Sequence, residues 1–243
     1  MLSEARQLNR TELVKAYGTE SAAVTSALDA LHAFAGFHLW AITGWIDARP
    51  HPAHDLLFAC FHKALLSLYT AHELTLDGLY GLARPHLRHA FESAMIAKLC
   101  AVDPDSDVFD RWIDGIDLYF TNGVLKRLRQ PDTTEFSSTW SLMCQWSHAT
   151  VYAAQLSLDV ETTEEEAGLN IAFIGVLLNC LHHLLNTHIL TPTVKYYAQR
   201  YGRSARGTEA RAQLKNALAV LSPRFGPGSR RLVRDYKATW QLQ

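Results

Sequence analysis

Three long stretches of this chain contain no Asp, Glu, Lys or Arg: residues 30–46, 136–158 and 167–190. Apolar residues recur along the chain at the three- and four-residue spacing of an α-helix, and no alternating strand pattern bounded by hairpin turns occurs in the sequence. A helix that carries no charge has to be covered by other helices. The sequence therefore predicts an all-α bundle of about seven to nine helices, in which these three stretches are the most buried.

Helices without charges can also span a membrane, which requires about 20 predominantly apolar residues. The first uncharged stretch is short, and the other two contain many Ser, Thr, Gln, Asn and His residues without a flanking aromatic and basic girdle. We therefore predict that the chain does not span a membrane. The amino-terminal sequence MLSEARQLNR lacks the apolar core of a signal peptide. The four cysteines lie in apolar runs, which is typical of buried thiols in a reducing compartment, so we expect a cytoplasmic protein.

Prolines and glycines predict where the helices end. We expect a short helix over 3–17, a second over 21–47 that ends before Pro50, and a third that begins near Ala53. Gly78 and Gly81 predict a break before a helix over 84–99, with Pro85 in its first turn. The next helix is expected over 107–128, with an apolar face of Phe109, Trp112, Ile113, Ile116, Phe120 and Val124.

Charge is distributed unevenly, although the net charge of the whole chain is −1. Residues 195–243 contain eleven Lys and Arg against two acidic residues, a net charge of +9, so the remainder carries −10. This asymmetry predicts an acidic partner for the carboxyl-terminal part, either nucleic acid or an acidic protein surface. We divide the chain into a helical bundle, 1–201, and a basic helical extension, 202–243. The candidate nucleic-acid-binding residues are Arg203, Arg206, Arg211, Lys215, Arg230, Arg231 and Arg234.

A polar stripe runs along the otherwise apolar segment 73–105. Arg88 and Glu92 are four residues apart and so lie on one face of a helix, and Glu73, Asp77 and Arg84 continue the same stripe. Charged groups on a buried helix must face water, a partner group or a ligand.

The chain contains no His-Glu-x-x-His, Glu-x-x-His, Walker, Gly-x-Gly-x-x-Gly or Gly-x-Ser-x-Gly motif, so we predict no metal and no cofactor. The remaining candidate catalytic residues are Arg88, Glu92 and His148. Arg88 offers a planar fork for phosphate, His148 can transfer a proton near neutral pH, and Glu92 can orient either one. Together they would suffice for metal-independent cleavage of RNA. The alternative is a structural network, in which Arg88 and Glu92 form a buried pair that ties helices together and a hydroxyl group satisfies His148.

The sequence LTLDGLYGLARPHLRHAFESAMIAKLCAVDPD, followed by QWSHATVYA about fifty residues later, resembles a broad group of bacterial helical proteins. This group has an Arg-x-x-x-Glu helix and a later Ser-His element, and is thought to be related to AbiV-type abortive-infection proteins and HEPN domains. The resemblance covers about residues 55–160. It implies an all-α, often dimeric bundle with a role in defence or toxin systems, acting on RNA. The HEPN signature is Arg followed by His after four to six residues; Arg84 and His89 have this spacing, but Pro85 directly follows the Arg.

Two functional hypotheses follow from the sequence. In the first, the protein is a defence- or toxin-type effector that binds or cleaves RNA with the three candidate catalytic residues and the basic extension. In the second, it is a non-catalytic helical module that forms a homodimer or binds an acidic protein partner. The basic extension is compatible with both hypotheses.

Overall fold

The computed structural model describes residues 2–43, 52–128, 134–147, 164–190 and 205–238. Within these ranges every regular element is helical, so the prediction of an all-α bundle with seven to nine helices is confirmed. The α-helices are α1 Leu2–Thr43, α2 Ala53–Leu76, α3 Tyr80–Val102, α4 Val108–Ile113, α5 Thr134–Ser147, α7 Glu164–Leu184, α9 Ala205–Leu221 and α10 Pro227–Ala238. The shorter turns are η2 Thr121–Leu125, η3 Leu185–Leu190 and η4 Ser222–Arg224.

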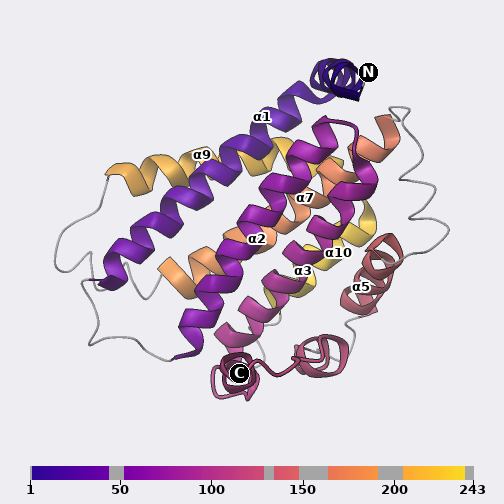
Figure 1. Cartoon of the computed structure of the whole chain (residues 1–243). Helices are drawn as coiled ribbons and strands as arrows, with labels where there is room; N and C mark the ends of the chain where they lie inside the picture. Colours follow the sequence, from indigo (N-terminus) through magenta and orange to yellow (C-terminus); the bar gives the residue numbers. More distant parts are fainter. Residues whose placement is uncertain (1, 44–51, 129–133, 148–163, 191–204, 239–243) are drawn as a thin grey trace.

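An antiparallel pair of helices, α2 and α3, lies at the centre of the bundle (Figure 1). The turn between them depends on Gly78, whose φ of +76° is rarely adopted by residues with a side chain. A Cβ at this position would also lie 2.5 Å from Nδ2 of Asn9. The predicted break at Gly78 is therefore confirmed. The following helix begins at Tyr80, earlier than predicted, so Pro85 lies inside α3 and removes one backbone hydrogen bond from it.

The first two predicted helices, 3–17 and 21–47, are joined in the structure. They form α1, which is interrupted by a kink at Tyr17, where φ is −127° and ψ is 22°. The sequence therefore predicted the position of the interruption correctly, but the structure has a kink there and not a break between two helices. The last residues of the predicted second helix, 44–47, lie outside the described residues.

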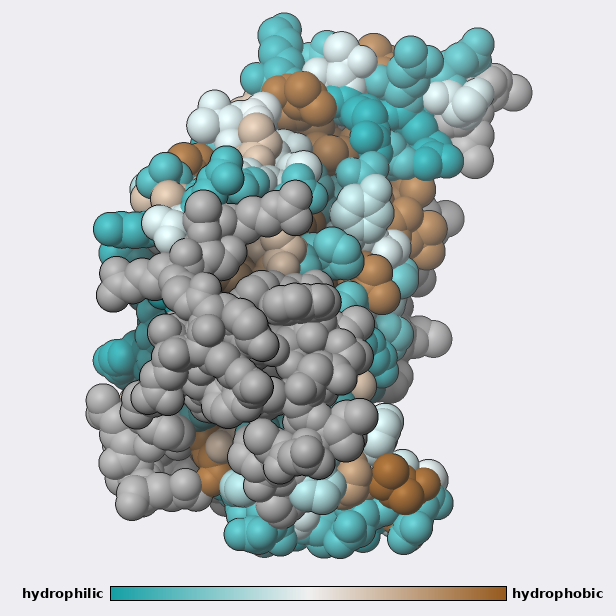
Figure 2. Space-filling view, turned by 90° about the vertical axis from the view of Figure 1, so that its left-hand side faces the viewer, coloured by the Kyte–Doolittle hydropathy of each residue, from teal (hydrophilic) through white to brown (hydrophobic). Residues whose placement is uncertain are grey.

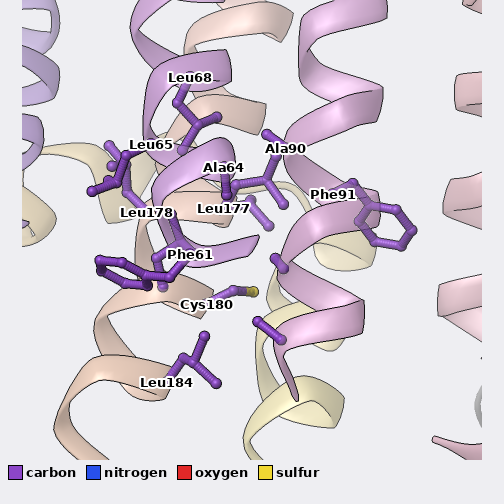
Figure 3. Close-up of a cluster of buried hydrophobic side chains, with 14 of the residues drawn as sticks. Phe61, Ala64, Leu65, Leu68, Ala90, Phe91, Leu177, Leu178, Cys180 and Leu184 are labelled. Atoms are coloured by element: carbon purple, nitrogen blue, oxygen red, sulfur yellow. The ribbon is translucent and has the colours of Figure 1, made fainter. Parts of the chain in front are cut away.

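The hydrophobic core fills the space between α2, α3 and α7 (Figure 3). Ala64 of α2 lies beside Ala90 of α3, and Leu68 of α2 with Leu177 and Leu184 of α7 belong to the same cluster; all five side chains are buried. Burial of one such Leu or Phe side chain contributes roughly 1.5–3 kcal/mol. The prediction that the stretch 167–190 is among the most buried is confirmed.

Of the described helices, one is long and apolar enough to cross a membrane by length and composition, the segment Glu165–Ile189, which covers most of α7 and η3. Within the bundle, 61% of its most apolar window is buried. A core helix of a globular protein passes the same test, so this helix is weak support for a membrane span. The predicted absence of a membrane span stays a prediction.

The prediction for the stretch 136–158 is wrong in its described part. Residues 136–147 belong to α5, which packs at the side of the bundle against α3 and exposes its outer face. Phe136, Met143 and Trp146 are buried, whereas Leu142 is 43% exposed. Uncharged Ser, Thr and Gln side chains occupy much of the exposed face, and these residues can be solvated without carrying a charge.

The predicted helix over 107–128 is also wrong, because α4 ends at Ile113. Gly115 directly follows the Asp114 cap with a φ of +66°, a conformation that terminates helices. The chain then runs without regular structure to η2. As a consequence, half of the predicted apolar face does not point into the core: Trp112, Ile113 and Ile116 are exposed.

The basic helices α9 and α10 pack on different parts of the bundle. Helix α9 lies along α1, whereas α10 lies against α7 and α5. Leu214 of α9 and Leu232 of α10 belong to the same core cluster as α2, α3 and α7. Tyr236 is fully buried, and its hydroxyl donates a hydrogen bond to the carbonyl of Ala94 at 3.0 Å. The described part of the extension 202–243 thus shares the main core, and a separate domain with that boundary stays a prediction.

Candidate functional site

The predicted polar stripe divides into three parts with different partners. At its amino-terminal end, Asp77 accepts hydrogen bonds from Arg6 and Arg10 of α1, and Glu73 binds Arg10 at 2.8 Å. The pKa of Asp77 is lowered by these arginines, which outweigh the opposing effect of burial. This part of the stripe therefore fastens α1 to the α2–α3 turn.

The second part is Arg84, whose side chain is completely buried. Its guanidinium forms an ion pair with Glu166 of α7 and lies 4.7 Å from the ring centroid of Trp146. Asn170 accepts a hydrogen bond from Nε of Arg84 at 3.5 Å and donates one to Thr75 at 3.2 Å. Because its charge is paired within the core, Arg84 has a structural role.

The third part, Arg88, has no such carboxylate. Within the described residues it forms no ion pair, and its Nε is buried without a hydrogen-bond partner. Its guanidinium carbon lies 4.6 Å from the ring centroid of Trp140 on α5. Stacking on an aromatic ring fixes the plane of a guanidinium and leaves its edges available for hydrogen bonds. Arg88 is therefore held in place by a group that does not neutralise it.

The neighbouring carboxylate, Glu92, is partly exposed one turn further along α3. Burial raises its pKa above the ordinary value, the charges of Arg88 and Lys63 oppose this rise, and Asp117 adds to it. Glu92 and Arg88 are thus close enough to interact through space, although they form no direct ion pair in the described structure. The predicted alternative of a buried Arg88–Glu92 ion pair is not observed.

Helix α5 contributes two residues that the sequence analysis did not assign to the site, Trp140 and Cys144. Burial raises the pKa of the Cys144 thiol, and this pKa also responds to the charges of Arg88 and Glu92. Trp140 is positioned by Phe120, whose ring centroid lies 4.3 Å away, and by Phe91 at 6.5 Å. A usable signal was the four-residue spacing of Trp140 and Cys144, which puts both on one helix face.

The third predicted catalytic residue, His148, lies outside the described residues. In the sequence it directly follows Ser147, the last residue of α5, and comes four residues after Cys144. The described part of α5 packs against α3. The structure thus brings together Arg88 and Glu92 with Trp140 and Cys144, and the placement of His148 in the site stays a prediction.

The predicted nucleic-acid-binding residues have diverse surroundings. Arg231 binds Glu135 at 2.7 Å, Arg234 binds its neighbour Asp235 at 3.0 Å, and Nε of Arg230 donates to the carbonyl of Phe225. Arg211 and Lys215 are exposed on α9 and form no ion pair within the described part of the chain. The Arg203 residue and the Arg206 side chain lie outside the described residues. The described residues of this set therefore lie on two helices that pack on different parts of the bundle.

A second polar cluster lies at the other end of α3. Nζ of the buried Lys98 lies 3.3 Å from Nε2 of His183 and 3.4 Å from Nε2 of His188. Burial lowers the pKa of Lys98 to about 8, that of His183 to about 4 and that of His188 to about 3. Tyr236 covers the amine with its ring. Neutral imidazoles accept hydrogen bonds from the ammonium group, so the cluster joins α3 to α7 and η3.

No group of three or more His, Cys, Asp or Glu residues in the described part of the chain is arranged to hold a metal ion. The four cysteines, Cys60, Cys100, Cys144 and Cys180, are free thiols. Comparison with protein-family models, with curated proteins and with solved structures finds no match for this chain.

Proposed function

We propose that this protein binds RNA and cleaves it without a metal ion, as an effector of defence or toxin type, with Arg88, Glu92 and His148 as its site residues. The supporting observation is Arg88, stacked on Trp140 with a buried Nε that has no partner. A buried donor without a partner destabilises a protein by about 1–3 kcal/mol. A ligand that supplies the missing acceptor would remove this cost. A phosphate offers two acceptor oxygens to the planar guanidinium of Arg88.

In the proposed reaction, the 2′-hydroxyl of a ribose attacks the adjacent phosphorus as His148 removes its proton. The bond from phosphorus to the 5′-oxygen breaks, and this oxygen receives the proton that His148 took from the 2′-hydroxyl, which leaves a 2′,3′-cyclic phosphate, a 5′-hydroxyl and a neutral His148. Arg88 would stabilise the negative charge that develops on the phosphoryl oxygens. Glu92 would orient the guanidinium or the imidazole. Every step uses side chains of the protein and the substrate alone.

The experiment measures binding and cleavage of a labelled single-stranded RNA in the presence of a chelator. We expect Arg88→Ala and His148→Ala to lower the cleavage rate by about 10²-fold or more, the usual contribution of such groups. An oligonucleotide with 2′-deoxyribose should bind but remain uncleaved. Lys15→Ala, an exposed residue of α1, is the control and should match the wild type. Equal cleavage by the wild type and by both site variants would refute the proposal, as would failure of the wild type to bind RNA.

Arg211 and Lys215 provide a separate test of the extension. If they contact phosphates, replacing both with Ala should reduce the slope of log affinity against log salt by about 1.4, which is about 0.7 for each contact on a single strand. Arg231 and Arg234 are paired with carboxylates, so replacing them should change the slope less. An unchanged slope in the Arg211 and Lys215 variant would exclude the described part of α9 from RNA binding.

A second candidate function is a non-catalytic interaction module that self-associates as a homodimer. It is favoured by the ion pairs of Arg224 with Glu20 and of Arg231 with Glu135, because they commit part of the basic extension to the bundle itself. The two candidates differ in a direct measurement. Under the second one, RNA does not bind at low salt, and the mass in solution at micromolar concentration is that of a dimer.

A further inference from the structure

A group of four large apolar side chains is exposed at the end of the bundle formed by α4 and the chain that follows it. Trp112 is 43% exposed, Ile113 62%, Ile116 47% and Tyr119 61%. In Figure 2 the lower end of the molecule, where α4 lies in Figure 1, shows hydrophobic residues beside hydrophilic ones. Single exposed apolar residues are common, but four large ones within eight positions are a concentration that favours an interaction site. We refer to these four residues as the α4 surface.

Acidic residues surround the α4 surface. Asp110, Asp114 and Asp117 are exposed, and Asp110 and Asp114 form no ion pair in the described part of the chain. Arg111 is the one basic residue between them: it donates to the carbonyl of Asp117 and lies 5.2 Å from the ring centroid of Tyr119, so three carboxylates stand against one guanidinium. The field around the α4 surface is therefore negative.

The backbone conformation supports a functional role for this surface. Tyr119 has a φ of +47°, which is rare for an aromatic residue and destabilises the chain by about 1–3 kcal/mol. The neighbouring residue, Phe120, is buried against Trp140. This arrangement keeps Tyr119 at the surface while Phe120 remains in the core. Strain of this kind persists where it positions a side chain for a function.

We propose that the α4 surface is the docking site for a basic amphipathic helix of a partner protein. An apolar face on such a helix would cover Trp112, Ile113 and Tyr119, and its lysines or arginines would lie against Asp110 and Asp114. The charge argues against other occupants: nucleic acid and anionic lipid are repelled, and so is the same surface of a second copy of this chain. Phe120 connects the docked partner to Trp140, and therefore to Arg88, by direct packing.

A designed peptide provides the first test. The probe is a synthetic helix of about 18 residues, or five turns, with leucines on one face and lysines on the other. A peptide with glutamate in place of each lysine keeps the apolar face and reverses the charge. We expect the lysine peptide to bind the full-length protein with an affinity that falls as salt rises, and the glutamate peptide to bind at least about tenfold more weakly. Equal binding of both peptides, or no binding of the lysine peptide, would overturn the proposal.

Variants of the protein locate the binding. Trp112→Ala combined with Ile113→Ala should weaken the lysine peptide by about tenfold or more, as expected for anchors at an interface. Asp110→Asn combined with Asp114→Asn should weaken binding at low salt and reduce its salt dependence. The matched control is Leu66→Ala with Tyr69→Ala, because both residues are exposed on α2, at 63% and 56%.

Three outcomes of the variant series would reject the proposal. The first is an equal loss of binding in the α2 control, and the second is no loss in the Trp112 and Ile113 variant. The third is a dimer of the wild-type protein that this variant converts to a monomer, since the occupant would then be a second copy. RNA cleavage is not measured in these experiments, so their result is independent of the proposed ribonuclease activity.

Discussion

Two arginines one turn apart on α3 should differ widely in how much stability the same substitution removes. Arg84 is completely buried and paired with Glu166, whereas Arg88 is stacked on Trp140 and has an unpaired Nε. Removing one partner of a buried ion pair typically lowers the free energy of unfolding by about 3–5 kcal/mol. Glu166 is 23% exposed and can be partly hydrated after the change. We therefore expect Arg84→Ala to be near the lower limit, at about 3 kcal/mol.

The balance for Arg88→Ala is different. The substitution removes a stacking interaction worth about 0.5–1 kcal/mol at a partly exposed site. It also removes the buried Nε, whose missing hydrogen bond is unfavourable by about 1–3 kcal/mol. The two effects oppose each other, so the free energy of unfolding should change by less than about 1 kcal/mol. Arg88 is then a residue that the fold does not require.

Equilibrium unfolding in urea, followed by circular dichroism, measures both variants under the same conditions. If Arg84→Ala is too unstable to purify, Glu166→Gln tests the same ion pair from its more exposed side and should also lower the midpoint. A loss for Arg88→Ala as large as that for Arg84→Ala would refute the reasoning. It would mean that Arg88 has a structural partner, and the phosphate site would lose its main support.

Three further predictions concern single residues. Burial lowers the pKa of Lys98 to about 8, so the folded state disfavours the protonated amine. The difference in the free energy of unfolding between Lys98→Met and the wild type, measured in urea, should therefore shrink by up to about 3 kcal/mol as pH rises from 8 to 10.5. Burial lowers the pKa of His72 to about 4, so the unfolded state takes up a proton at a higher pH than the folded state does. As pH falls from 6.5 to 5, the free energy of unfolding should therefore decrease by about 2 kcal/mol more for the wild type than for His72→Gln. Tyr119→Gly should be more stable than Tyr119→Ala by about 1 kcal/mol, since glycine alone adopts a φ of +47° without strain; equal midpoints would contradict this.

The sequence predicted the helices well where periodicity and turn residues agreed. Gly78 marks the turn between α2 and α3, and the apolar spacing of 167–190 identified a core helix. The α4 segment was predicted poorly, because the helical spacing of its apolar residues continues beyond the Asp114-Gly115 end of the helix. Periodicity gives the face on which residues would lie in a helix, but a single glycine in a left-handed conformation ends the helix regardless of that spacing.

The partners of charged residues were the least predictable part of the site. Spacing placed Arg88 and Glu92 correctly on one face of α3, but it contained no information on which helix would face them. Trp140 was overlooked because an aromatic residue in an uncharged stretch is most often a core residue. Similarly, the charge asymmetry is visible in the sequence, whereas the pairing of Arg231 with Glu135 depends on how α10 packs against α5.

Once the packing is known, the sequence explains why Arg84 and Arg88 differ. Arg84 points to the start of α7, where the acidic run Glu164, Glu165 and Glu166 supplies a carboxylate. Arg88 points to α5, and residues 136–147 on that helix contain no acidic residue that could pair with it. An uncharged helix packed against an arginine therefore leaves the arginine able to bind an anion from outside the fold. The absence of charge in 136–147, which we first took as a sign of burial, is the feature that leaves Arg88 available to a phosphate in the proposed site.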